Sequence, residues 1–330
     1  MLTVGQAHSP PVEIGVVVPT CVGTFSANGE CLAGWDCLGV GVWRVEDGKQ
    51  VGAMKARLVQ CLAVSIDGKW IAAGTFDGDT LVWDANTYKQ VFAHKDVGIN
   101  GVDFSPDSTR LVSASSSGTA IVWDIATREQ VRTLHHEGWV AAAKYSPQGD
   151  RIATATLDGS VRIWDSNDGR LLVEIPVKVS PFYNTGLLWF HDHLFVLSKS
   201  DINEFEASTG SALSRWPVPG TNLSSSIALP EHGEFIAYST GSTVAFWDTS
   251  THAQLDLIQL TENSPSIALP PDNRFLAIGE SQKITFKSLS HIIVSIVFHW
   301  IVPCPNMLPC SSFYTGFNPI LSSTKHALGT

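Results

Sequence analysis

A bulky aromatic residue recurs along the chain at a nearly constant interval. The positions that carry it are Trp43, Trp83, Trp123, Trp164, Phe205, Trp247 and Phe286. Successive gaps are 40, 40, 41, 41, 42 and 39 residues, and in four cases an aspartate directly follows the tryptophan. A fixed period of this length indicates one small structural unit used repeatedly. The spacing predicts seven units that stack on one another, because a single unit cannot bury its own apolar face.

The fourth unit, residues 133–165, shows the pattern most completely. Two apolar runs, 140–145 and 151–156, flank a turn with the sequence Ser-Pro-Gln-Gly, and an Asp-Gly turn leads into a third run at 161–164. Related turns begin at Ser26, Ser65 and Ser105 and drift to other sequences at 230–233 and 270–273. Short apolar runs separated by such turns are typical of antiparallel strands. Each unit is therefore predicted to be a small β-sheet.

Composition agrees with a folded chain that does not favour nucleic acids. Of 330 residues, 44% are hydrophobic and 16% are charged, which is typical of a protein with a large core. Thirty-one acidic residues against 21 lysines and arginines give a net charge of −10, which repels phosphate backbones. We expect no nucleic-acid partner.

The period, the Trp-Asp dipeptide and the Ser-rich turn together resemble the WD40-repeat family over residues 12–290. The resemblance implies an all-β fold, a seven-bladed β-propeller with four strands in each blade. Aligning Ser26 with Ser146 places residues 12–14 at the position of an outer strand, while the last repeat ends near Ser288 on an inner strand. We therefore predict that a strand within residues 10–18 completes the seventh blade and closes the ring.

This organisation gives three segments: an extension at 1–11, the propeller at 12–290 and a divergent tail at 291–330. The tail lacks the repeat turn and the Trp-Asp dipeptide. The sequence leaves four explanations open: an added strand, a partner-binding segment at 292–300, a poorly ordered tail, or an error in the gene prediction. The longest apolar run, 292–302, is too short to span a bilayer, and no secretory signal is recognisable. We expect a cytoplasmic protein with no membrane partner, the nucleus being the alternative.

The six cysteines are Cys21, Cys31, Cys37, Cys61, Cys304 and Cys310. Their spacing contains no CxxC pair, so reduced thiols that pack as small apolar side chains are the favoured interpretation. A zinc site formed by the first four is the alternative. Elsewhere, His191-Asp192-His193 has the spacing of two metal ligands on one side of a strand, but its place in the repeat favours a solvated turn. Neither pattern leads us to expect a metal or a cofactor.

Four polar residues stand out in the fourth unit, namely His136, Thr156, Asp158 and Trp164. On paper they resemble a hydrolase triad, but family resemblance implies instead a structural network that links His, Ser or Thr, Asp and the indole. Partial copies recur as Thr75, Asp77 and Trp83, and as His94, Ser115, Ser117 and Trp123. An activated nucleophile is needed once, whereas repetition indicates a structural role. Asp36, Asp103 and Glu262 are predicted to be surface or turn residues.

The fold that the resemblance implies presents loops from every blade around a central channel. The loops that precede each first strand, and those that join second to third strands, are expected to form one rim. Aromatic and charged side chains on such loops are candidates for partner contacts. They are Trp35, Phe76, Lys95, Trp139, Phe182 and Tyr183. Trp139 is the best single candidate, and local packing between blades is the alternative for Trp35 and Phe76.

The predicted function is a monomeric, non-catalytic scaffold that binds proteins or peptides on this rim. The first alternative is an enzyme, a hydrolase or lyase, with its site at the mouth of the channel. A regulatory domain whose catalytic partner is a separate chain is the second alternative. A fold alone does not distinguish these functions.

Overall fold

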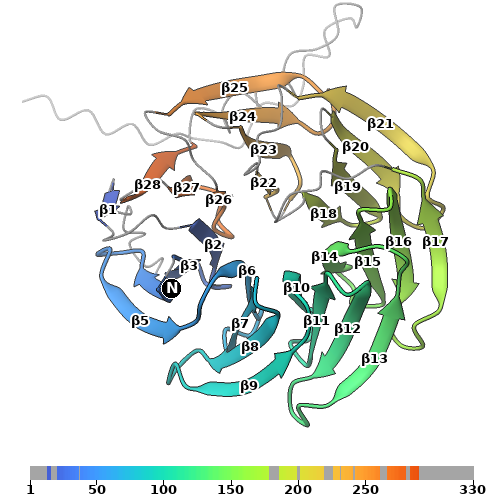
Figure 1. Cartoon of the computed structure of the whole chain (residues 1–330). Helices are drawn as coiled ribbons and strands as arrows, with labels where there is room; N and C mark the ends of the chain where they lie inside the picture. The colour runs from blue at the N-terminus through green and yellow to red at the C-terminus, as the bar shows by residue number, and fades with distance from the viewer. Residues whose placement is uncertain are drawn as a thin grey trace, which may run out of the picture.

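The computed structural model is a ring of seven four-stranded antiparallel sheets, arranged radially like the blades of a propeller (Figure 1). The structure describes residues 13–15, 21–36, 38–177, 186–198, 201–218, 226–230, 232–240, 242–260, 266–279 and 283–289. Within these ranges every regular element is a strand. The predicted all-β, seven-bladed architecture is confirmed.

The blades follow one another in chain order, and each runs from a first strand near the centre to an outer strand at the periphery (Figure 1). Blade 1 holds β2 (Cys21–Phe25), β3 (Cys31–Trp35), β4 (Gly39–Arg44) and β5 (Gln50–Lys55). Blade 2 holds β6 (Val59–Val64), β7 (Trp70–Thr75), β8 (Asp79–Asp84) and β9 (Gln90–Lys95). Blade 3 holds β10 (Ile99–Phe104), β11 (Arg110–Ser115), β12 (Thr119–Asp124) and β13 (Gln130–His135). Blade 4 holds β14 (Val140–Tyr145), β15 (Arg151–Thr156), β16 (Ser160–Asp165) and β17 (Leu171–Ile175).

The second half of the ring repeats this plan with shorter first strands. Blade 5 holds β18 (Leu187–Phe190), β19 (His193–Leu197), β20 (Asp201–Glu206) and β21 (Ala212–Pro217). Blade 6 holds β22 (Ile227–Ala228), β23 (Phe235–Thr240), β24 (Thr243–Asp248) and β25 (Gln254–Gln259). Blade 7 holds β26 (Ser266–Ala268), β27 (Phe275–Gly279), β28 (Lys283–Ser288) and β1 (Glu13–Gly15).

Blade 7 closes the ring with strands from both ends of the propeller. β1 pairs antiparallel with β28, and Glu13 lies opposite Thr285. The predicted closing strand within residues 10–18 is therefore confirmed. Its outer place in the blade agrees with the prolines that precede it, because proline is tolerated at the edge of a sheet.

Apolar residues fill the space between neighbouring blades. One cluster joins Val112 and Val122 of blade 3 to Ala143, Ile152 and Trp164 of blade 4. Each of these side chains is at most 8% exposed. Both faces of a blade are covered by its neighbours, which is why the strands are continuously apolar. Neighbouring blades therefore stabilise one another.

The recurrent serine of the first turn has a structural explanation. In blade 2 the Ser65 hydroxyl donates to the Asp67 carboxylate at 2.7 Å and accepts the N–H of Trp70 at 2.9 Å. The hydroxyls of Ser26, Ser105 and Ser146 accept the N–H of the residue five positions later in the same way. The serine thus satisfies a backbone donor that the turn would leave unpaired.

Two sets of connections alternate in space because the strands are antiparallel. We call the loops before each first strand, together with those between second and third strands, the upper rim. The turns between first and second strands and between third and outer strands form the lower rim. The upper rim is the one that the sequence singles out for partner binding.

Candidate functional site

The polar network of blade 4 is built on Thr154, not on the predicted Thr156. The indole N–H of Trp164 donates to Thr154 Oγ1 at 2.8 Å, and Nε2 of His136 lies 2.9 Å from the same oxygen. The rings of His136 and Trp164 meet edge to face with centroids 5.2 Å apart. The His-hydroxyl-Trp part of the predicted network therefore exists, with a different hydroxyl.

Strand geometry explains the difference. Trp164 lies opposite Ile152, so Thr154 is its diagonal neighbour on the same face of the sheet. Thr156 lies four residues from Ile152, about 13 Å along the strand, which an indole cannot reach. Thr156 instead bonds to Asp158 at 2.5 Å, within a separate cluster at the upper rim.

This second cluster fixes the loop between β15 and β16. Ser160 donates to Asp158 through its hydroxyl at 2.8 Å, and Arg162 forms an ion pair with the same carboxylate at 3.2 Å. Partial burial opposes ionisation, but hydrogen bonds from Thr156 and Ser160, and then Arg162, hold the pKa of Asp158 below its ordinary value. Asp158 is therefore a charged carboxylate at neutral pH and is part of a loop scaffold.

His136 is poorly suited to act as a base near neutral pH. Burial, helped by the positive charge of Arg162, lowers its pKa to about 4. Thr154 is fully buried, so its hydroxyl is not available as a nucleophile for a substrate. The arrangement matches a structural polar network, in which Thr154 satisfies His136 Nε2 and the Trp164 indole, while His136 Nδ1 has no hydrogen-bond partner among the described residues.

In blade 3, as in blade 4, the hydroxyl that bonds to the indole lies two residues before the predicted one. In blade 3 the indole of Trp123 donates to Ser113 at 2.9 Å, so Ser113 replaces the predicted Ser115. His94 contacts the Trp123 ring with centroids 4.4 Å apart. Ser115 instead donates to the carbonyl of Val97 at 2.6 Å, and Ser117 lies within hydrogen-bond distance of its hydroxyl. A hydroxyl ten residues before each tryptophan is the signal that would have found Ser113 and Thr154.

Blade 2 lacks this bond because Ala73 occupies the place of the hydroxyl. Trp83 is buried among apolar residues of blades 1 and 2. Thr75 accepts the N–H of Asp79 at 2.8 Å, while Asp77 lies exposed on the loop. The predicted grouping of Thr75, Asp77 and Trp83 is therefore not a network.

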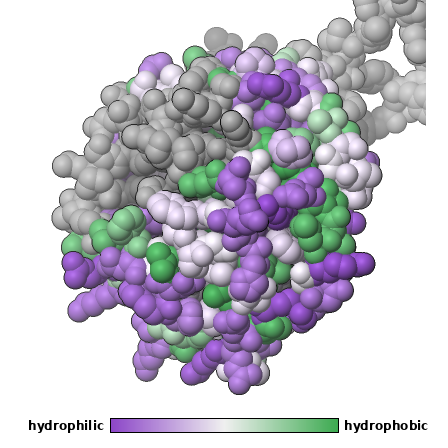
Figure 2. Space-filling model, turned by 45° about the vertical axis from the view of Figure 1, so that its right-hand side comes forward, coloured by the Kyte–Doolittle hydropathy of each residue, from purple (hydrophilic) through white to green (hydrophobic). Residues whose placement is uncertain are grey.

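The upper rim carries a row of exposed apolar side chains over blades 1 to 4. Its members are Leu38, Leu58, Phe76, Val97, Trp139 and Leu157, each between 37% and 69% exposed. Each lies in a loop before a first strand or between a second and a third strand. We call this set the apolar arc. On the face that Figure 2 shows, hydrophobic patches are separated by hydrophilic residues.

An acidic residue accompanies five of the six members of the apolar arc. The five are Asp36, Asp77, Asp96, Glu137 and Asp158, each one or two positions from its apolar neighbour. Several also fix their loops, since Asp36 accepts the N–H of Leu38 and Asp96 accepts that of Val97. Leu58 is the exception, because it follows Arg57. The upper rim of blades 1 to 4 thus combines apolar and negatively charged side chains.

The candidates for partner contacts fall into three groups. Trp139 and Phe76 are each 56% exposed and lie on upper-rim loops as predicted. Lys95 is also exposed and forms an ion pair with Asp79 at 3.1 Å. Trp35 is the exception, because it is the last residue of β3 and is only 8% exposed, packed among core residues of blades 1 and 2. Phe182 and Tyr183 lie outside the described residues.

Comparison with protein families decides the identity of the repeats. The family model of the WD domain, G-beta repeat, matches residues 48–84, 86–124 and 128–165. Three WD40 repeats therefore lie within the seven-bladed propeller. Propellers of this family typically serve as protein-interaction scaffolds and are generally non-catalytic. No curated protein matches the chain. The part of the chain that the structure describes contains no helix long and apolar enough to cross a membrane.

The channel of the WD40 propeller holds a small cavity of about 180 Å³. Two charged residues, Asp103 and Lys144, belong to its lining and form an ion pair at 2.7 Å. Asp103 also accepts the N–H of Tyr145 at 2.9 Å and so joins blades 3 and 4. Asp103 was predicted to be a surface or turn residue, but it is a partly buried residue of β10.

The remaining predicted groups have structural surroundings in this WD40 propeller. His191 and Asp192 form the predicted turn, and His193 begins β19, where its Nδ1 lies 2.6 Å from Glu204. Asp36 stabilises a turn as expected, while Glu262 lies outside the described residues. Cys61 is buried, as expected of a core thiol, but Cys31 is half-buried. Within the described ranges no three metal-binding side chains converge.

Proposed function

We propose that this WD40 propeller is a non-catalytic scaffold that binds a protein or peptide on the upper rim of blades 1 to 4. The apolar arc is the observation that carries the proposal. Six of the twelve exposed large hydrophobic residues in the described part of the chain lie on this rim, and exposed apolar surface bordered by polar residues is typical of interaction sites. The polar network of blade 4 supports the same function, because it stabilises the blade and does not provide a reactive group.

Trp139 is the proposed anchor of this surface. Its ring is 56% exposed, yet its backbone carbonyl accepts the N–H of Leu157 at 3.0 Å, which holds its loop against the next one. An exposed tryptophan on a fixed backbone loses little conformational freedom when it binds, so it contributes strongly to affinity. Phe76, two blades away, provides a second aromatic contact.

The acidic residues of the rim indicate the chemistry of the partner. Five carboxylates stand beside the apolar arc, and the whole chain carries a net charge of −10. Opposite charge speeds association and disfavours other acidic partners. We therefore propose a partner segment that combines apolar side chains with lysine or arginine, and we expect its binding to weaken as salt concentration rises.

The proposal is tested with a rim variant and a matched control. The rim variant combines Trp139→Ala with Phe76→Ala, and the control combines Val131→Ala with Leu213→Ala, two exposed apolar residues on outer strands. Partners captured by the wild-type chain are compared with those captured by each variant. A partner of the rim should be lost, by at least tenfold, from the first variant and retained by the second.

Thermal unfolding of the same proteins completes the test. Both variants should unfold within a few degrees of the wild type, because the four substituted side chains are exposed. Equal capture by the rim variant and the wild type would contradict the proposed surface. A large fall in melting temperature of the rim variant alone would show that these aromatic residues stabilise the fold instead.

A further inference from the structure

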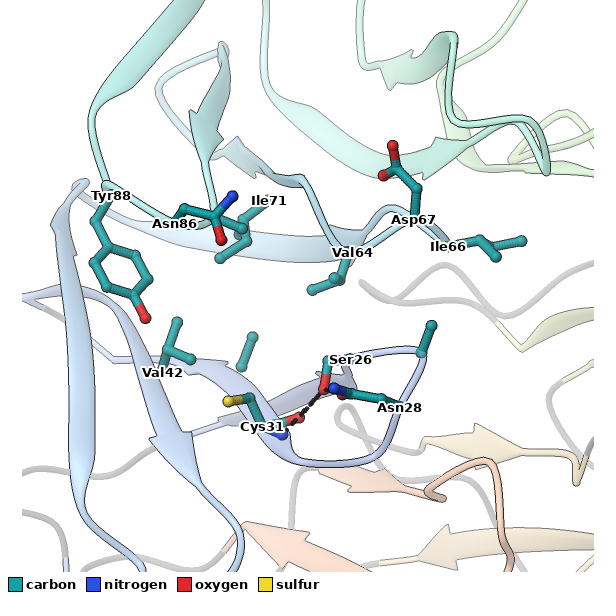
Figure 3. A pocket seen from close by; sticks show the side chains of 14 residues that line it. Ser26, Asn28, Cys31, Val42, Val64, Ile66, Asp67, Ile71, Asn86 and Tyr88 are labelled. Carbon is teal, nitrogen blue, oxygen red and sulfur yellow. Dashed lines mark hydrogen bonds between the residues drawn. The ribbon is translucent and has the colours of Figure 1, made fainter. Parts of the chain in front are cut away.

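A cleft of about 550 Å³ opens on the lower rim between blades 1 and 2. Its walls come from β3 and β4 on one side and from β6, β7 and the turn after β8 on the other (Figure 3). The lining is apolar at Ala33, Val42, Val64 and Ile71. Polar side chains also line the cleft, namely Ser26, Asn28, Asp67, Asn86 and Tyr88. Volumes of this size, lined by both apolar and polar groups, lie in the range of ligand pockets.

The cleft lies where blade 1 carries a small residue at a position that holds a large side chain in every other blade. Cys31 is the first residue of β3 and lies opposite Arg44, the last residue of β4. The residues at the same register in blades 2 to 7 are Trp70, Arg110, Arg151, His193, Phe235 and Phe275. Six large side chains thus correspond to one thiol.

Several of these large side chains reach across to the next blade. Trp70 packs against the apolar cluster between blades 2 and 3, and Phe275 meets Phe25 of blade 1 with ring centroids 5.8 Å apart. Arg151 bonds to Asp192 of blade 5 at 3.1 Å, and the cavity beside it measures only about 200 Å³. A side chain at this position therefore joins two blades, and blade 1 lacks it.

The walls indicate what chemistry would replace the absent side chain. Four of the six corresponding residues are aromatic, and seven of the fourteen residues that line the cleft are aliphatic, which suits the face of a flat ring. A guanidinium is less suitable, since Asp67, the carboxylate at the cleft, already pairs with Lys69 at 2.9 Å. The Asn86 side chain faces the cleft (Figure 3), where its amide oxygen can accept a hydrogen bond from a ring N–H.

Tyr88 shapes the peripheral end of the cleft. Its ring lies against Gly52 of β5, where an added Cβ would come within 2.3 Å of the ring. Gly52 thus allows the tyrosine to lie across the two blades with its hydroxyl directed toward Val42 (Figure 3). A ligand in the cleft would therefore meet an aromatic edge at one end and the Ser26–Asn28 turn at the other.

We propose that this cleft binds a planar aromatic group with a ring N–H, an indole, in the place that a blade's own side chain fills elsewhere. The site lies on the rim opposite to the apolar arc and does not depend on the proposed function. The indole is supplied either by a free small molecule or by a tryptophan of a peptide.

Indole itself is the first probe, and the thiol of Cys31 reports on the cleft. The full chain is treated with a thiol reagent with and without indole, and modification of Cys31 is followed by mass spectrometry of its peptide. Indole should slow the modification at least fivefold in a saturable manner. Cyclohexanol, a matched aliphatic probe, should slow the modification of Cys31 less than twofold. No protection by indole up to its solubility limit would overturn the proposal.

Substitution at the same position gives an independent test. Cys31→Trp would place an indole in the cleft, so this variant should no longer bind indole and should melt at a higher temperature than Cys31→Ala. The alanine variant keeps the cleft open and should bind indole within threefold of the wild type. If Cys31→Trp binds indole as Cys31→Ala does, the cleft is not the site. Loss of indole binding by Cys31→Ala would also contradict the assignment.

The two sources of the indole are distinguished with a short peptide that has one central tryptophan. Binding at least tenfold tighter than that of free indole, lost in Cys31→Trp, indicates a peptide ligand. Binding no tighter than that of indole indicates a small molecule. Either result supports the aromatic site, while loss of rim-dependent capture in the Trp139 variant is measured separately and tests only the proposed scaffold function.

Discussion

The half-buried histidine of the blade 4 network gives a pH dependence that can be measured. The folded chain holds the pKa of His136 at about 4, mainly through burial, against an ordinary value of 6.5. Protonation is therefore disfavoured in the folded state. Between pH 6.5 and pH 4 the unfolded chain binds a proton at this residue and the folded chain does not. Because the unfolded state binds more protons, the free energy of unfolding falls as the pH falls.

The size of the effect follows from the two pKa values. A difference of this size corresponds to a loss of about 3 kcal/mol from this one residue between pH 7 and pH 4. Below pH 4 both states are protonated and the contribution levels off. Other titrating groups add to the total, so the quantity to measure is the difference between two proteins.

The perturbation is His136→Gln, which removes the titrating group and retains a polar side chain near Thr154. Urea unfolding is measured at pH 7 and at pH 4 for the wild type and the variant. The variant should be less stable at pH 7, since the bond to Thr154 is altered, but should lose about 3 kcal/mol less than the wild type on acidification. His135→Gln, at an exposed neighbour, should behave as the wild type. Equal losses for His136→Gln and the wild type would refute the reasoning.

Two further substitutions test contacts between blades. Gly52→Ala should lower the free energy of unfolding by about 1–3 kcal/mol, because the added methyl group would collide with the Tyr88 ring, and urea unfolding measures this. No loss would show that the ring moves freely away. Asp103→Ala should cost about 2 kcal/mol, since Lys144 loses its 2.7 Å partner and a buried backbone N–H loses its acceptor. Asp272→Ala, which removes an exposed ion pair, should cost less than about 0.5 kcal/mol, and equal losses would contradict this account.

The sequence was sufficient to predict the architecture because each blade meets the same requirements. A serine in every early turn satisfies a backbone donor, and a large aromatic residue ends most third strands. These needs recur with the repeat, so they are visible as a period. The alignment of turns also predicts closure by a strand within residues 10–18. It places an outer strand before blade 1, and this strand can pair only with the third strand of the last blade.

The candidate site was predicted less completely, for two physical reasons. The hydroxyl of the network was assigned to Thr156 from its distance to Trp164 along the chain, whereas cross-strand pairing selects Thr154. The sequence places Trp35 on a loop, although it is the last residue of β3 and pairs with Val40 as Ala155 pairs with Val161 in blade 4, in a second strand whose side chains are buried. Both differences follow from the pairing of residues across the sheet. Distances along the chain do not show which side chains meet.

The lower-rim cleft could not be predicted at all. Cys31 in isolation is a small residue that fits any core, and nothing in its neighbourhood along the chain marks it as unusual. The space beside it depends on Tyr88 and on the walls of the next blade, which lie far away in sequence. This cleft is formed by side chains of two blades together, whereas the repeat pattern describes the residues of one blade at a time.

The pairing of β1 with β28 also has a consequence for synthesis in the cell. β1 is the first strand of the propeller to be synthesised, and its partner strand is made only when nearly the whole propeller has been translated. Until then blade 7 cannot form, and blade 1 lacks its neighbour on that side. Such pairing between distant segments is slow, and unpaired strand edges can join other chains in the interval. A nascent chain of this protein therefore exposes unpaired strand edges until its last blade is complete.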